Sequence, residues 1–209
     1  MPSRAPLLAV AAAVLVLSTG VAGCSDDGDS EPAPAVHTAA NGDVYNDADA
    51  DFATDLVQHH ALALVLVDLS RAAQVSPDLT AVAAEVLDAG SVEIQTATGW
   101  LAEWDLPVPE TIRDHANAHA AERGEEVDIP GGELPGMPDH ADLAELEELT
   151  GPDFEQRWLE LMVAHHEGAI VIAEEEAGNG EFAPAVELAE SVAATQEDQI
   201  EQMRALLGE

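Results

Sequence analysis

Two copies of a helix that carries a histidine pair constrain the fold of this chain more than any other feature. Residues 154–173, FEQRWLELMVAHHEGAIVIA, place apolar residues at three- and four-residue steps, which predicts an amphipathic helix. His165 falls on the apolar stripe, and His166 lies about 100° further round the helix. Residues 51–70, DFATDLVQHHALALVLVDLS, repeat this pattern. Both histidine pairs therefore sit on the arc that a helical bundle buries.

A second helix follows each copy at the same offset, which indicates an internal duplication. Ile94 lies 35 residues after His59, and Ile200 lies 35 residues after His165 (94 − 59 = 200 − 165). Proline, glycine and capping residues delimit the expected helices, at about 48–73, 76–104, 140–149, 151–178 and 183–207. The predicted fold is all-α: a four-helix bundle of two duplicated hairpins, 48–104 and 151–207, joined by a linker, 105–150. A pseudo-twofold axis would bring all four imidazoles together.

The N-terminus predicts export. Arg4 precedes an apolar run that is too short to span a membrane but suits a signal peptide. Val21-Ala22-Gly23-Cys24 resembles the lipobox of bacterial lipoproteins, which implies that residues 1–23 are removed and Cys24 is lipidated. The expected location is the cell envelope, outside the cytoplasm, with a lipid anchor in the membrane. An ordinary signal peptide with an incidental cysteine is the alternative.

Residues 24–46 are acidic and contain proline and glycine, so they predict a disordered tether that leads into a bundle over 47–208. The whole chain has 42 acidic residues against 6 basic ones and a net charge of −36. This charge argues against nucleic acid as a partner, because phosphate binding needs a basic patch. The acidic surface is typical of salt-tolerant proteins or of weak cation attraction, and it identifies no protein partner.

The histidines favour metal binding over catalysis. None of the eight histidines has a glutamate three residues before it, so the Glu-x-x-His pattern of di-iron bundles is missing. Met162 occupies that position before His165, and Met203 could add a second thioether. Imidazole suits copper or zinc, and thioether favours Cu(I). The predicted metal ligands are His59, His60, His165, His166, Met162 and Met203. Copper is the expected metal and zinc the alternative.

The HH-x-x-A blocks, with Gln196, Ile200 and Met203 downstream, resemble the family called domain of unknown function 305. The run GMPDHADLAELEELTGPDFE also resembles that family's entry to its second half, and the likeness covers about residues 48–207. It implies a ferritin-like bundle in the bacterial envelope, and some relatives are linked to copper. The family commonly has methionine three residues before each histidine pair, but this chain has Leu56 in the first half. Fewer thioethers favour a histidine-dominated site that accepts Cu(II) or Zn(II).

Two main hypotheses follow. In the first, a lipid-anchored envelope protein binds copper through the paired histidines and serves metal buffering or tolerance, without enzymatic activity. In the second, the protein is a non-catalytic structural or interaction module. Its buried histidines then form a hydrogen-bonded network with groups such as Asp55 or Glu93. A redox enzyme that uses the bound metal is a third hypothesis.

Overall fold

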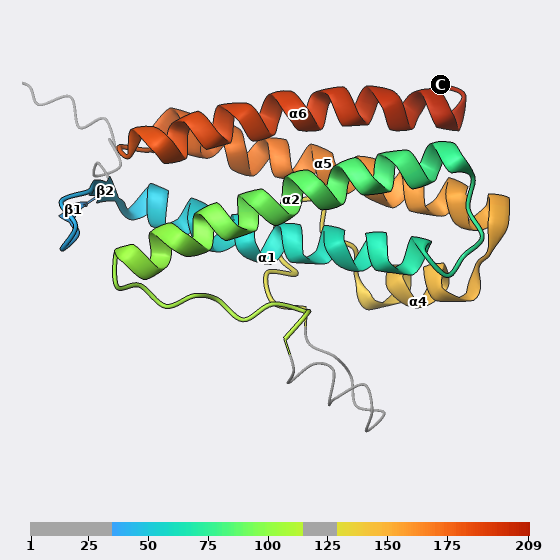
Figure 1. Cartoon of the computed structure of the whole chain (residues 1–209), viewed down its shortest axis with the longest axis horizontal. Helices are drawn as coiled ribbons and strands as arrows, with labels where there is room; N and C mark the ends of the chain where they lie inside the picture. The colour runs from blue at the N-terminus through green and yellow to red at the C-terminus, as the bar shows by residue number, and fades with distance from the viewer. Residues whose placement is uncertain (1–34, 115–128) are drawn as a thin grey trace, which may run out of the picture. The chain divides into compact units, whose positions relative to one another are not determined.

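A computed structural model describes residues 35–114 and 129–209 of the chain. The predicted signal peptide, Cys24 and the first part of the predicted tether lie outside these residues. The described part is mostly helical, which confirms the expected all-α bundle (Figure 1). Its helices are α1 (Asp47–Ser70), α2 (Pro77–Glu103), α4 (His140–Glu148), α5 (Gly151–Asn179) and α6 (Ala183–Leu207).

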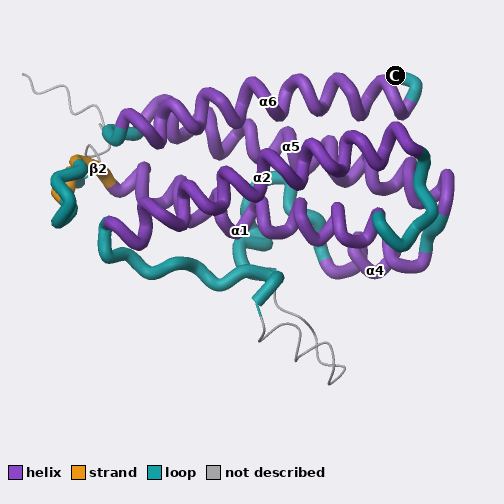
Figure 2. The backbone as a smooth tube through the Cα atoms, in the orientation of Figure 1, coloured by secondary structure: helices purple, strands orange, loops and turns teal. Residues whose placement is uncertain are grey.

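The four long helices form two antiparallel hairpins that pack against each other (Figure 2). Helix α1 pairs with α2, and α5 pairs with α6. Between the hairpins, α1 packs mainly on α5 and α2 on α6, while α4 lies against α5. This is the pairing that a pseudo-twofold axis requires, so the two histidine-bearing helices lie side by side.

Side chains that cap the helices fix where the helices begin. The Asn46 side chain accepts a hydrogen bond from the Asp49 amide, and the Asp49 side chain accepts one from the Asn46 amide, so the two form a capping box at α1. Helix α2 begins with Ser76 as its cap and Pro77 in its first turn. Asp139 caps α4. Local side chains therefore fix where α1, α2 and α4 begin, whereas the N-cap residues of α5 and α6 make no side-chain hydrogen bond to their helices.

The prediction of a disordered tether is wrong for residues 36–46. A short antiparallel hairpin precedes α1, formed by β1 (Val36–Thr38) and β2 (Val44–Asn46), with Val36 opposite Asn46. Gly42 adopts a φ of 98° in its turn, which glycine allows without strain. Tyr45 stacks on Trp104 at the end of α2, with ring centroids 4.2 Å apart. The acidic composition predicted too little apolar burial to order this segment. The contact between Tyr45 and Trp104 supplies that burial.

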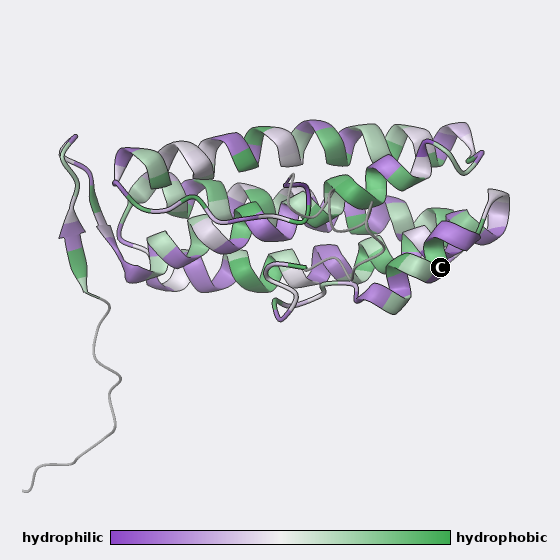
Figure 3. Cartoon of the chain, turned by 90° about the horizontal axis from the view of Figure 1, so that it is seen from below, coloured by the Kyte–Doolittle hydropathy of each residue, from purple (hydrophilic) through white to green (hydrophobic). Residues whose placement is uncertain are grey.

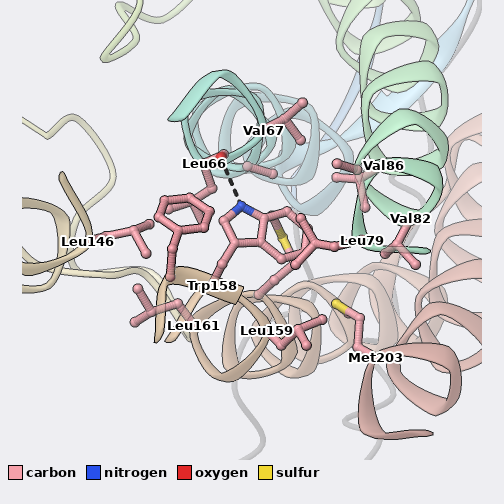
Figure 4. Close-up of a cluster of buried hydrophobic side chains, with 14 of the residues drawn as sticks. Leu66, Val67, Leu79, Val82, Val86, Leu146, Trp158, Leu159, Leu161 and Met203 are labelled. Atoms are coloured by element: carbon pink, nitrogen blue, oxygen red, sulfur yellow. Dashed lines mark hydrogen bonds between the residues drawn. The ribbon is translucent and has the colours of Figure 1, made fainter. Parts of the chain in front are cut away.

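Two clusters of buried apolar residues lie along the bundle. One surrounds Trp158, whose indole N–H donates to the Leu66 carbonyl at 2.8 Å (Figure 4). The other contains Phe52, Leu101 and Ile172. Along α1 and α5 the histidine pairs come between the residues of one cluster and those of the other. The histidines thus form a polar layer between two apolar ones.

Hydrophilic and hydrophobic patches both occur on the helical ribbons of the bundle, as expected for amphipathic helices (Figure 3). Among the helices of residues 35–114 and 129–209, only α1 is long and apolar enough to span a membrane. However, 67% of its most apolar window is buried inside the bundle. The bundle core therefore accounts for the apolar character of α1.

Candidate functional site

Four buried histidines meet at mid-bundle. The rings of His59 on α1 and His165 on α5 stack with centroids 3.8 Å apart and planes 14° apart. The His60 ring is 6.0 Å from that of His59, and the His166 ring is 6.4 Å from that of His165. None of the four side chains is more than 3% exposed. The two helices thus bring the four imidazoles into one neighbourhood, as the duplication predicted.

One histidine of each pair bonds to a residue on the second helix of its own hairpin. His60 Nε2 lies 2.6 Å from a carboxylate oxygen of Glu93 on α2. His166 Nε2 lies 2.7 Å from the side-chain oxygen of Gln199 on α6. Both partners follow their histidine by 33 residues (93 − 60 = 199 − 166). Asp55, the other carboxylate considered from the sequence, makes no hydrogen bond to an imidazole in the described part of the chain.

A segment of the linker covers the stacked pair. Residues 129–138, here called the strap, cross α1 and α5, and His59 Nε2 donates to the Pro135 carbonyl at 3.0 Å. The strap approaches α5 at Gly168, where a Cβ would overlap the Pro135 carbonyl and lie 2.8 Å from the Gly136 nitrogen. Gly136 itself has a φ of 73°. Two glycines therefore allow backbone to pack on backbone beside the histidines.

Several polar atoms in this layer have no hydrogen-bond partner within residues 35–114 and 129–209. They are Nδ1 of His59 and His166, both ring nitrogens of His165, and the side-chain oxygen of Gln196. Leaving a buried polar group unpaired costs about 1–3 kcal/mol. His165 is the one imidazole of the four with neither nitrogen in a hydrogen bond of good geometry to the described residues, although the Gly136 backbone lies beside its ring. Such a layer indicates a place for a ligand, an ion or water.

A cavity of about 10 Å³ lies beside the histidine layer, between α2 and α6. That volume is about what one water molecule needs. The cavity borders Gly90, which occupies in the first hairpin the position of Gln196 in the second. Its polar walls are formed by His60, Glu93, His165, His166, Gln196 and Gln199. Because Gly90 has no side chain and the surrounding groups can form hydrogen bonds, this is a polar cavity with room for about one water molecule.

His59, His165 and His166 are neutral at physiological pH. Burial, followed by the charge of neighbouring imidazoles, lowers the pKa of His59 to about 3 and the pKa of His165 well below its ordinary value. Burial also lowers the pKa of His166 to about 4. A neutral imidazole keeps one nitrogen lone pair free. These three rings thus offer lone pairs rather than positive charge.

The donors fit a transition metal in kind, but they are not oriented to hold one. Imidazole lone pairs lie in the ring plane, so the stacked rings of His59 and His165 cannot direct them at a common ion. Across residues 35–114 and 129–209, no group of three or more His, Cys, Asp or Glu side chains is arranged to hold a metal. Met162 and Met203 are fully buried in the apolar cluster around Trp158, and neither lines the cavity. The six predicted ligands therefore do not form one ready-made site.

Comparison with known families identifies the chain. The profile of domain of unknown function 305 (DUF305) matches residues 49–207. The chain belongs to the DUF305 family.

Solved DUF305 structures share the fold. A DUF305 protein from Streptomyces coelicolor, named as a predicted secreted protein, is 26% identical over 77% of this chain and 92% of its own, with a TM-score of 0.64. A DUF305 fragment from Deinococcus radiodurans is 22% identical over 82% of this chain and 99% of its own, also with a TM-score of 0.64. Comparison with curated proteins gave no match.

A third neighbour, CopM, has been solved with metal. Its Cu(II)-bound form is 21% identical to this DUF305 chain over 76% of the chain and 94% of its own, with a TM-score of 0.58. Cu(I)-bound, Ag-bound and apo forms of CopM also match. At this identity the likeness shows a common fold.

Sequence reasoning missed two parts of the DUF305 site. Gln199 is not among the residues predicted from the sequence, although the equal 33-residue spacing could have indicated it as the partner of His166. The strap was also missed. A glycine at position 168, on the buried arc of a long helix, was a signal that another backbone comes close there.

Proposed function

We propose that this DUF305 protein binds a transition metal, copper first and zinc as the alternative, through the histidines of its polar layer. The observation that carries the proposal is His165, whose two ring nitrogens are buried without a hydrogen-bond partner in the part of the chain that the structure describes. Bound metal would satisfy a nitrogen that the fold leaves unpaired. Neutral imidazole is a good ligand for both copper and zinc.

The residues suited to hold the ion are His59, His165 and His166, which carry the unpartnered nitrogens. The His60 ring is held in place by the contact of its Nε2 with Glu93. Carboxylates outside the ligand shell orient metal-binding histidines in the same way. The stacked rings must separate before their lone pairs can share an ion, so binding includes a rearrangement of His165. Met162 and Met203 can contribute only after a larger movement, which favours Cu(II) or Zn(II) over Cu(I).

Two further observations support copper and an envelope location. CopM has the same fold and is named in Cu(I)- and Cu(II)-bound forms. The Streptomyces relative is named as secreted, in line with the export signal predicted over residues 1–23. The protein would then be held at the membrane by a lipid on Cys24 and would buffer metal outside the cytoplasm or provide tolerance to it. The proposal includes no catalytic step.

One specific observation favours a second function, that of a structural or interaction module. Three of the four histidines already have a partner: Pro135 for His59, Glu93 for His60 and Gln199 for His166. In this alternative the layer serves to fix the register of the two hairpins. A single water in the cavity would complete its hydrogen bonds.

Titration of the exported chain with Cu(I), Cu(II) and Zn(II) separates the two functions. The chain should begin at residue 24 and carry Cys24→Ser, which removes its one thiol. We expect stoichiometric binding by this protein and its loss in His165→Ala/His166→Ala. His37→Ala is the matched control, because His37 is exposed and paired with Asp47. Equal, weak binding by all three proteins would mean that the acidic surface collects ions and that the histidines are structural.

A further inference from the structure

We infer that the strap is the positioning element of the histidine layer: its Pro135 carbonyl holds His59 in one tautomer, so that only Nδ1 can face a ligand. We further infer that the contact of the strap with Gly168 keeps it closed over the stacked pair. The inference about the His59 tautomer depends only on the hydrogen bond between His59 and Pro135. The consequence for metal uptake rests on the proposed function.

The hydrogen bond determines which nitrogen of His59 carries the proton. A backbone carbonyl can only accept, so Nε2 must donate in the 3.0 Å contact with Pro135. The ring is neutral in its buried position, which leaves the lone pair on Nδ1. That nitrogen is buried and has no partner in the described part of the chain. The strap therefore leaves the lone pair of His59 on Nδ1, the ring nitrogen that does not bond to the linker.

The contact that holds the strap in place depends on two glycines. A Cβ at Gly168 would overlap the Pro135 carbonyl, and a Cβ at Gly136 would overlap the Ala164 carbonyl and lie 3.1 Å from the Gly168 Cα. Both obstacles are backbone atoms, which cannot turn aside as a flexible side chain could. The strap can approach the histidines closely only because neither position carries a side chain.

The equivalent position on α1 shows that this contact is specific to α5. Gly168 follows His165 by three residues, and Leu62 follows His59 by three. Leu62 is fully buried and fills its site with a side chain. A strap could not lie on α1 in the same way. The strap therefore packs on α5 at Gly168, while its Pro135 carbonyl accepts a hydrogen bond from His59 of α1.

The test compares Gly168→Ala with Gly178→Ala in the exported chain with Cys24→Ser. Alanine favours a helix at both positions, but only Gly168 faces the strap, since a Cβ at Gly178 would have open space. Long-range ¹H–¹⁵N spectra of the metal-free protein report which nitrogen of each histidine is protonated. We expect His59 to be protonated on Nε2 in wild type and in Gly178→Ala, and to become a mixture of tautomers in Gly168→Ala.

Copper association gives the second readout. Displacing the strap removes one hydrogen bond from the closed state, so Gly168→Ala should take up Cu(II) roughly fivefold faster than wild type, the factor that one ordinary hydrogen bond is worth. Gly178→Ala should match wild type. If no variant binds copper but the tautomer shift occurs, the positioning role stands and the proposed function fails.

Two results would overturn the inference. One is a wild-type His59 protonated on Nδ1, which needs no variant to observe and so decides the matter even if Gly168→Ala unfolds. The other is a folded Gly168→Ala with the wild-type tautomer and the wild-type rate of copper association.

Discussion

The first hairpin, α1–α2, and the second, α5–α6, hold equivalent histidines in equivalent contacts but surround them with different residues. In both, the second histidine of the pair bonds a side chain 33 residues later, at 2.6 Å in the first and 2.7 Å in the second. The acceptor is the carboxylate of Glu93 in one hairpin and the amide of Gln199 in the other. The duplication thus keeps the geometry of the pair, while single replacements change its charge.

The apolar surroundings differ as well. Positions 106 residues apart are equivalent, because His165 follows His59 by that number (165 − 59 = 106). Trp158 and Met162 in the second hairpin stand where the first has Phe52 and Leu56. At these two positions the second hairpin therefore carries the larger side chains, and its Gly168 contacts the strap. The carboxylate that bonds a histidine comes from the first hairpin, at Glu93.

The largest expected effect is a loss of stability when the two equivalent buried aromatic residues, Trp158 and Phe52, are replaced. Trp158→Ala should lower the free energy of unfolding by about 5 kcal/mol and Phe52→Ala by about 3–4 kcal/mol, within the range for buried aromatics. Trp158 is fully buried and also loses its bond to the Leu66 carbonyl, whereas Phe52 makes apolar contacts only. Urea denaturation of both variants measures the difference. Equal losses would show that the indole bond adds nothing.

The next prediction concerns a carboxyl group that only the second hairpin has. Burial and, after it, the neighbouring Asp49 carboxyl group raise the pKa of Glu176 from 4.5 to about 8. The folded chain then binds more protons than the unfolded chain between these values, so stability is present below pH 4.5 and declines as pH rises toward 8. The decline is at most about 1.4 kcal/mol per pH unit.

Replacing that carboxyl should therefore flatten the pH profile. Glu176→Gln is expected to remove this decline in free energy of unfolding, measured by urea denaturation from pH 5 to pH 8.5. Ser70, buried at the equivalent position of the first hairpin, has no titratable group, so Ser70→Ala serves as the control and should keep the wild-type slope. A wild-type slope in Glu176→Gln would contradict the prediction.

A third prediction makes the two histidine contacts alike. Glu93→Gln keeps an oxygen acceptor for His60 but removes its charge. A hydrogen bond to a charged group contributes about 1 kcal/mol more than one between neutral groups, so the variant should be less stable by about that amount. Glu85→Gln, on the exposed side of the same helix, should leave stability unchanged. If both variants lose equally, the effect belongs to overall charge and not to the contact.

The smallest expected effect is a gain in stability from a substitution in the first hairpin. Gly99 lies inside α2 with open space around its missing Cβ, and the equivalent residue in α6 is Ala205. Gly99→Ala should stabilise the protein by about 0.5–1 kcal/mol through helix propensity. Ala205→Gly should cost a similar amount or less, because it lies nearer its helix end. Thermal unfolding of the two variants should show shifts of opposite sign.

Much of the fold could be predicted because its signals are local. The caps at Asn46, Ser76 and Asp139 set helix starts within a residue or two of those expected. The spacing of the duplicated histidines placed four imidazoles together. The hairpin at residues 36–46 was missed because its stability comes from Tyr45 stacking on Trp104, a contact between residues far apart in the sequence.

The site was predictable in composition but not in orientation. Sequence spacing shows which residues approach one another, but it cannot show that His59 and His165 stack or that Met162 points into the apolar cluster. These details depend on side-chain packing. The strap could not be predicted for a similar reason. Helical periodicity shows which residues of one helix share a face, but it does not show that the strap lies against Gly168.

The β-hairpin has a mechanical consequence for any pull on the chain from residue 35. Val36, at its free end, pairs with Asn46, the residue that leads into α1. Tension between these points opens the pairs one after another, as a zipper opens, instead of shearing them together. The ten residues after Val36 would then extend by roughly 34 Å at about 3.4 Å each. A load applied from the N-terminal side would thus be absorbed by this short extensible segment before it reached the histidine layer.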